Sequence, residues 1–131
     1  MGILRLAVDE QDRFSCVVLV GELDAGEVNG FERKLVRLEQ AQPPLLVVDL
    51  RDVGFIDSHG LSALLDAEAR ARGDGRRLML TRPPDSVMRV FQITLLDQRF
   101  EWLGRDAGDA LEFGLSNALD RLRQRAAEAD A

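Results

Sequence analysis

The residues with the greatest chemical potential form one short run, Asp57-Ser58-His59-Gly60. A serine hydroxyl beside an imidazole could supply a nucleophile and its base. Neighbouring side chains at the start of a helix, however, point about 100° apart, and no G-x-S-x-G elbow surrounds Ser58. Because His59 is the only histidine in the sequence, no other imidazole can take its place. We therefore do not expect an enzyme.

The sequence also lacks the ligands that metal and redox sites need. It has one cysteine, Cys16, inside the apolar run 14–20, and one histidine, so a set of thiolate and imidazole ligands cannot form. Asp49, Asp52 and Asp57 could gather a hard cation, but a turn accounts for Asp52 and a helix cap for Asp57. We expect Cys16 to be a small buried apolar residue, and we expect no metal and no cofactor.

The sequence does not match two other kinds of phosphate-handling domain. A receiver domain that is phosphorylated on aspartate needs an acidic pair after its first strand and a lysine late in the chain, whereas Lys34 is the only lysine. A nucleotide-binding loop needs glycines between a strand and a helix, whereas Gly73 and Gly75 follow a predicted helix. Neither fold is supported.

Composition narrows the classes of partner. The chain has 131 residues, 46% of them hydrophobic, and a formal net charge of −6. This length suits one compact domain, and the negative charge disfavours binding to nucleic acid. No apolar run approaches the ~20 residues of a membrane span, and the first residues lack the pattern of a secretory signal. We expect a cytoplasmic domain that binds neither nucleic acid nor membrane.

Periodicity places the elements around the Asp57-Ser58-His59-Gly60 run. Two β-type runs open the chain, and Asp24 with Glu27 resembles the capping box of a helix. A near-continuous apolar run after Pro44 is typical of a strand covered on both faces. The predicted strands are 3–8, 14–20, 45–50, 78–81 and 100–103, and the predicted helices start near 24, 58, 85 and 106.

This order, β-β-α-β-α-β-α-β-α, predicts an α/β fold. Right-handed crossovers turn it into a mixed, mostly parallel sheet of about five strands with an antiparallel edge strand. Ligands and modifications in such sheets lie beyond the carboxyl ends of the strands, where residues 57–60 belong. We expect one domain over residues 1–122. The polar, alanine-rich residues 123–131 should form a frayed tail.

The segment Val53-Gly54-Phe55-Ile56-Asp57-Ser58-His59-Gly60-Leu61 resembles a known motif. STAS domains of the anti-sigma factor antagonist type carry V-x-F-[IM]-D-[ST]-S-G-L, and Gly21-Glu22-Leu23-Asp24 matches their G-E-L-D. Residues 84–91 resemble the family's segment at its third helix, so the resemblance covers about residues 5–120. Two departures are that His59 replaces the usual serine and that residues 93–96 lack a glycine.

The resemblance implies a STAS fold and a partner-switching cycle. In that cycle the unmodified protein binds an anti-sigma factor of the GHKL serine-kinase type and so releases a sigma factor. Phosphorylation of Ser58 by the kinase inactivates the protein, and a serine phosphatase restores it. The same resemblance implies that Asp24, Asp57, Ser58, His59, Gly60 and Leu61 lie on or beside the partner contact, in a monomer or weak homodimer.

The physical chemistry of the site agrees with such a switch. With Asp57 as N-cap, Ser58 starts a helix where backbone N–H groups are unpaired and the helix dipole is positive. A phosphate there adds roughly −1.5 to −2 charges, so a partner is lost without unfolding. Two alternatives remain: a STAS scaffold or interaction module in another signalling or transporter-associated assembly without a phospho-switch, and a small enzyme on the same architecture.

Overall fold

The computed structural model describes residues 3–11, 13–104 and 110–128, with side chains in the last range from residue 115 onward. Within these residues, five strands form one sheet in the order β1-β2-β3-β4-β5. The strands are Leu4–Glu10 (β1), Ser15–Leu23 (β2), Leu45–Ile56 (β3), Arg77–Leu80 (β4) and Glu101–Trp102 (β5). The helices are Val28–Glu39 (α1), Ser58–Gly73 (α2), Asp85–Ile93 (α3), the 3₁₀ turn Leu96–Gln98 (η1) and Ala110–Glu128 (α4).

The sheet is mixed in the way that its connections require. β1 pairs antiparallel with β2, because only a short polar loop joins them. The pairs β2–β3, β3–β4 and β4–β5 are parallel, and α1, α2 and α3 lie on the crossovers between them. β3 is therefore the central strand, and its residues Leu45–Leu50 are buried.

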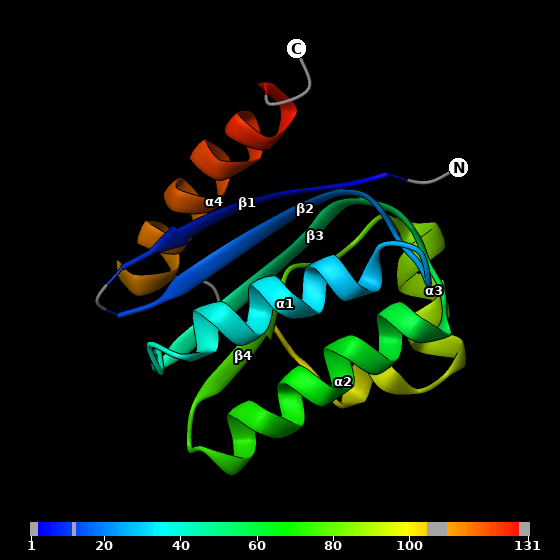
Figure 1. Cartoon of the computed structure of the whole chain (residues 1–131), viewed down its shortest axis with the longest axis horizontal. Coiled ribbons are helices and arrows are strands. Elements are labelled where there is room, and N and C mark those ends of the chain that lie inside the picture. The colour runs from blue at the N-terminus through cyan, green and yellow to red at the C-terminus, as the bar shows by residue number, and fades with distance from the viewer. Residues whose placement is uncertain (1–2, 12, 105–109, 129–131) are drawn as a thin grey trace.

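Helices cover both faces of the sheet, as Figure 1 shows with α1 and α2 on one side of the strands and α4 on the other. The larger core lies under α1, α2 and α3, and Phe31, Leu64 and Phe91 are among the side chains that fill it. Phe91 also makes edge-to-face contacts with Phe100 and Trp102, at centroid distances of 5.9 and 5.4 Å. These contacts join α3 to the segment that forms β5.

A second core lies between the other face of the sheet and α4. Leu115, Leu119 and Leu122 of α4 pack there with Val47 of β3 and with Cys16. Cys16 is fully buried, as predicted. Its burial, with smaller effects of nearby carboxylates, raises the pKa of the thiol to about 12.

The end of α4 is more ordered than its polar composition suggests. The sequence predicts fraying from residue 123, whereas the helix continues to Glu128. Ala126 is buried against the sheet, Arg123 pairs with Asp52, and Arg125 donates to the Val8 carbonyl at 3.0 Å. Long-range contacts therefore hold residues 123–128, while residues 129–131 lie outside the described part of the chain.

The predicted fold class, element order, central strand and antiparallel edge strand are confirmed. Element ends differ by a few residues, and β3 continues to Ile56 instead of ending near Leu50. Residue 106, where the last helix is predicted to begin, lies outside the described residues. The side chain of Leu111 does so too.

Candidate functional site

The carboxylate of Asp57 joins two segments that follow neighbouring strands. Its Oδ1 accepts from the backbone N–H groups of His59 at 2.9 Å and Gly60 at 3.1 Å, and these bonds cap α2. Its Oδ2 accepts from the N–H of Ala25, after β2, at 3.0 Å. One side chain thus caps α2, as predicted, and also fixes the loop between β2 and α1.

The electrostatics of Asp57 follow from these contacts. Desolvation favours the neutral carboxyl, but three backbone N–H donors and the nearby His59 outweigh it and hold the pKa of Asp57 below its usual range. The imidazole Nδ1 of His59 lies 3.7 Å from Oδ2. Asp57 is therefore a carboxylate at neutral pH and a fixed negative charge beside Ser58.

Gly60 and Leu61 support the site from within the fold. A Cβ at Gly60 would lie 2.5 Å from the backbone oxygen of Leu23 and 2.8 Å from the side chain of Ile56, so only glycine fits. Leu61 packs into the larger core. Both residues are buried, so packing against Leu23, Ile56 and the larger core accounts for their residue types in the motif.

Asp24 organises the loop that faces the start of α2. Its Oδ1 accepts from the N–H groups of Gly26 at 3.0 Å and Glu27 at 3.1 Å. The sequence predicts that Asp24 and Glu27 cap the helix, but α1 begins at Val28 and Glu27 makes no side-chain cap. Asp24 therefore caps a turn ahead of α1, and that turn presents Ala25 to Asp57.

Ser58 and His59 are exposed at the rim of this arrangement. In the described part of the chain, the hydroxyl of Ser58 makes no hydrogen bond to a carboxylate, an imidazole or any other group. The site thus offers an accessible hydroxyl as an acceptor of a transferred group.

The sequence did not predict an exposed row of side chains that includes Phe55, three residues before Ser58. Phe55 of β3 is 48% exposed and pairs in register with Glu22 of β2, whose N–H donates to the carbonyl of Ile3. Ile3 is 69% exposed. These backbone contacts place the three residues in one row across neighbouring segments. The motif contains Phe55, but the sequence does not predict that its side chain is exposed. Register shifts in the pairing of β2 with β3 interrupt the alternation of buried and exposed residues.

Comparison with known proteins identifies the family. A match to the STAS domain covers residues 5–110, which is most of the chain. The chain belongs to the STAS domain family.

Named relatives of this STAS domain are anti-sigma factor antagonists. An anti-sigma-B factor antagonist of Staphylococcus aureus (strain NCTC 8325 / PS 47) is 29% identical over 91 residues, which cover 70% of this chain and 84% of the relative. The STAS domain also matches a crystal structure of an anti-sigma factor antagonist from Mycobacterium paratuberculosis, with a TM-score of 0.72, 24% identity, and coverage of 92% of this chain and 95% of the other.

A further structural neighbour is the anti-sigma factor antagonist SpoIIAA, solved in an unphosphorylated form. The TM-score is 0.61 at 21% identity, with 92% of this chain and 98% of SpoIIAA covered. SpoIIAA of Bacillus has also been solved in a phosphorylated form. At these identities the structural likeness supports the fold of the STAS domain.

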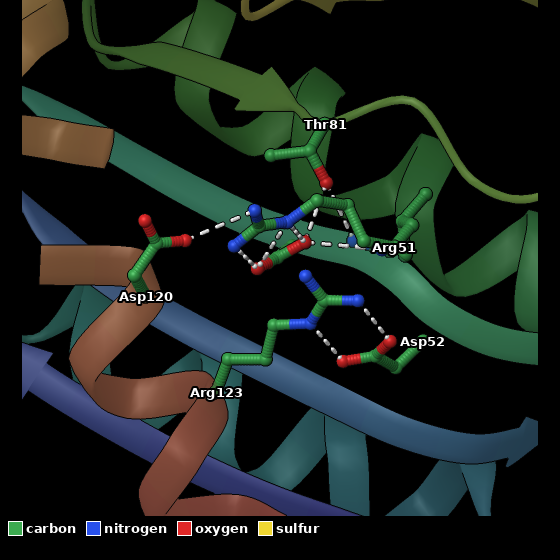
Figure 2. Close-up of polar contacts among 7 residues, drawn as sticks. Arg51, Asp52, Thr81, Asp120 and Arg123 are labelled. Atoms are coloured by element: carbon green, nitrogen blue, oxygen red, sulfur yellow. Dashed lines mark hydrogen bonds and ion pairs between the residues drawn. The ribbon is translucent and has the colours of Figure 1, made fainter. Parts of the chain in front are cut away.

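The other acidic residues of β3 in this STAS domain are paired with arginines (Figure 2). The buried Asp49 receives two bonds from the Nε and one from the Nη2 of Arg51, and a hydroxyl bond of 2.7 Å from Thr81. Asp52 is expected in a turn but lies within β3, where Arg123 of α4 donates to it at 2.5 and 2.6 Å. The two bonds from Arg123 connect α4 to the sheet.

No grouping of three or more metal-ligating side chains occurs among the residues that the structure describes. Asp49 and Asp52 are committed to arginines, and Asp57 is committed to backbone N–H groups. In the same described ranges, no helix is both long and apolar enough to cross a membrane.

Proposed function

We propose that this STAS domain is an anti-sigma factor antagonist that binds an anti-sigma factor through the surface around Ser58, and that phosphorylation of Ser58 breaks this contact. The names of the relatives support the general role. SpoIIAA, a protein of the same fold, has been solved in a phosphorylated form, which supports a phosphorylation site in this chain.

The observation that carries the proposal is the position of Ser58 just outside a completed helix cap. Asp57 already satisfies the N–H groups of His59 and Gly60, while Ser58 is exposed. A kinase can therefore reach the hydroxyl without opening the fold. The positive end of the α2 dipole also favours a negative group at this position.

Phosphate at Ser58 would change the charge that a partner meets. It adds roughly −1.5 to −2 charges beside Asp57 and near Asp24, in a chain of net charge −6. Each ~1.4 kcal/mol of lost interaction weakens binding tenfold, so about 3 to 4 kcal/mol gives a switch of several hundred-fold. One desolvated charge at the centre of an interface is enough for this effect.

The contact surface that we propose combines the predicted residues with the exposed row. Ser58 and His59 would lie at its centre, with Asp24 and Asp57 beside them. Phe55 is 48% exposed and would supply apolar area, because aromatic side chains, phenylalanine included, are enriched in the cores of interfaces. Gly60 and Leu61 would act only by holding the start of α2 in place.

The partner that the family resemblance suggests is an anti-sigma factor that is also a GHKL-type serine kinase. In this cycle the unmodified domain binds the anti-sigma factor, a sigma factor is released, and a serine phosphatase reverses the modification. Catalysis would then belong to the partners and binding to this chain. We propose a monomer or weak homodimer as the active form.

The first test maps phosphorylation in the protein's own cells by mass spectrometry during growth and under stress. We expect occupancy at Ser58 that changes with condition, and little at Ser62 and Ser86, which are also exposed and serve as internal controls. The absence of phosphate from Ser58 under every condition would favour the scaffold role without a phospho-switch.

The second test measures binding to the purified anti-sigma factor encoded by the same genome. We expect Ser58→Ala to bind like the unmodified protein, Ser58→Asp to bind about 100-fold more weakly or worse, and Phe55→Ala to lose about tenfold. Ser86→Asp is the matched control because Ser86 is an exposed serine in the first turn of another helix, α3. Equal affinity of the two aspartate variants would refute the switch.

A further inference from the structure

An open pocket of about 330 Å³ lies at the amino end of β4, at the opposite end of the sheet from Ser58. Four arginines line it: Arg72 near the end of α2, Arg76 and Arg77 at the start of β4, and Arg99 after η1. Its volume is at the lower end of the range of small-molecule sites, about 300–1,000 Å³. The α2 helix, about 24 Å long, separates this pocket from Ser58.

The carboxylates in the pocket are already engaged. Both oxygens of Glu68 accept from Nη1 of Arg72, at 2.5 and 2.8 Å, and one lies 3.7 Å from Arg99. Both oxygens of Glu101 accept from Arg77. Neither carboxylate is therefore left to neutralise Arg76.

Arg76 is the unusual member of the group. Its side chain is only 7% exposed, and its one ion pair joins Nη2 to the exposed Asp74 at 3.0 Å. Among the described residues, its buried Nε and Nη1 have no hydrogen-bond partner. Buried donors without acceptors are costly, particularly on a charged group. Nε and Nη1 of Arg76 therefore lack hydrogen-bond acceptors, which a ligand in the pocket could supply.

The backbone holds Arg76 in this position. Its N–H donates to the carbonyl of Ala71 at 2.8 Å, and Gly75 just before it has a φ of +71°. This is the arrangement that closes many helix C-termini. Because the turn fixes the backbone of Arg76 against the end of α2, its guanidinium is held in place before any ligand arrives.

The local charge is positive although the chain is acidic. The four arginines of the pocket outnumber the three nearby carboxylates, those of Glu68, Glu101 and Asp74. The whole chain, in contrast, has a formal net charge of −6. The carboxyl end of α2 contributes about half a negative charge, which reduces the positive balance without reversing it. A small anion can use this local field, whereas a large polyanion would also meet the negative remainder of the surface.

We propose that this pocket binds the phosphate group of a small molecule, with Nε and Nη1 of Arg76 as the inner donors. A phosphate has several acceptor oxygens and can serve donors that point in different directions. Because Nε and Nη1 of Arg76 are buried, a phosphate reaches them only when neighbouring side chains move. Arg72 and Arg99 are 62% and 52% exposed, so these two side chains can move aside and then close over the ligand. The proposal does not depend on phosphorylation of Ser58.

The test is an NMR titration of the ¹⁵N-labelled full chain with sodium phosphate and, separately, with adenosine monophosphate. Sodium chloride of equal ionic strength is the reference. We expect saturable shifts of the amides of residues 68–77 and 99–101, with little change at 57–60. Tighter binding of adenosine monophosphate would indicate a phosphate carried by a larger molecule, and equal or tighter binding of inorganic phosphate would indicate the free ion. Either result supports the site.

The variant Arg76→Met should weaken the phosphate response about tenfold or more, while Arg33→Met, at an exposed arginine of α1, should leave it unchanged. If Arg76→Met does not fold, Arg99→Met removes an exposed arginine of the same pocket and should weaken binding about threefold or more. The proposal fails if the shifts do not saturate, if chloride reproduces them, or if the pocket variants match Arg33→Met. A glutamate-rich peptide is titrated in the same way as a further probe. The proposal also fails if this peptide alone produces the shifts, because the pocket would then recognise a protein segment.

Discussion

Replacing Asp57 by alanine tests whether one carboxylate holds the start of α2 and the β2–α1 loop together. The substitution removes two cap bonds, to His59 and Gly60, and one long-range bond to Ala25. Loss of an N-cap costs about 1 kcal/mol, and loss of one further hydrogen bond costs about 1 kcal/mol. We expect a free energy of unfolding lower by about 2 kcal/mol, or a melting temperature lower by roughly 8 °C.

Urea unfolding at pH 7, followed by the fluorescence of the single tryptophan, Trp102, measures this change. Asp57→Asn keeps one acceptor oxygen, so it should lose about half as much as Asp57→Ala. Asp66→Ala is the matched control, because Asp66 is an exposed aspartate of the same helix. That control should change the free energy of unfolding by no more than about 0.5 kcal/mol.

The pH dependence provides a second, independent check. Because the pKa of Asp57 is lower in the folded state than in the unfolded chain, its contribution is present above the ordinary aspartate pKa of about 3.9. That contribution is lost as the pH falls through the folded-state pKa. The difference between the wild type and Asp57→Ala should therefore narrow below about pH 4. The reasoning is refuted if Asp57→Ala is as stable as Asp66→Ala, or if the difference is independent of pH.

Gly60→Ala should lower the free energy of unfolding by about 2 kcal/mol or more, because the new Cβ would meet a backbone oxygen of β2. Gly54→Ala is the control in the same urea assay. A Cβ at Gly54 would have no neighbouring atom within 4 Å, so this substitution should change the free energy of unfolding little. Thr81→Val should cost about 2 kcal/mol, since Asp49 and a β3 N–H each lose a buried partner, and a smaller loss would contradict the assigned bonds. Cys16 should react with a thiol reagent only in urea, because the thiol is buried and its pKa is raised to about 12; rapid reaction in buffer would show that α4 opens.

Features that depend on local pattern were predictable. The buried strand from Leu45 follows from a continuous apolar run, and the cap at Asp57 follows from an acidic residue directly ahead of a helix. The edge position of β1 follows from a short hairpin loop at the start of the chain. In each case neighbours in sequence determine the outcome, so the sequence alone contains the needed information.

Features that depend on distant segments were not predictable. The sequence predicts a turn at Asp52, whereas the residue lies within β3. Its partner there is Arg123, which is 71 positions away in the sequence. The same pair helps to order the end of α4, which reads as a frayed tail. Asp24 reads as a helix cap, yet the loop that it shapes is also held by Asp57 across 32 positions of sequence. Composition near a residue does not report such partners.

The arrangement of Asp57 also bears on how the proposed switch would act. Its Oδ1 occupies the N–H groups of His59 and Gly60, which are the donors that a phosphate on Ser58 would otherwise take. A phosphate on Ser58 could bind these N–H groups only by displacing the Asp57 carboxylate, which also anchors the Ala25 loop. A phosphate that points outward into solvent therefore costs less free energy than one bound at the start of α2. The charge is then presented to the partner and leaves the fold unchanged. Under the proposed function, the switch acts through the binding interface and not through a rearrangement of α2.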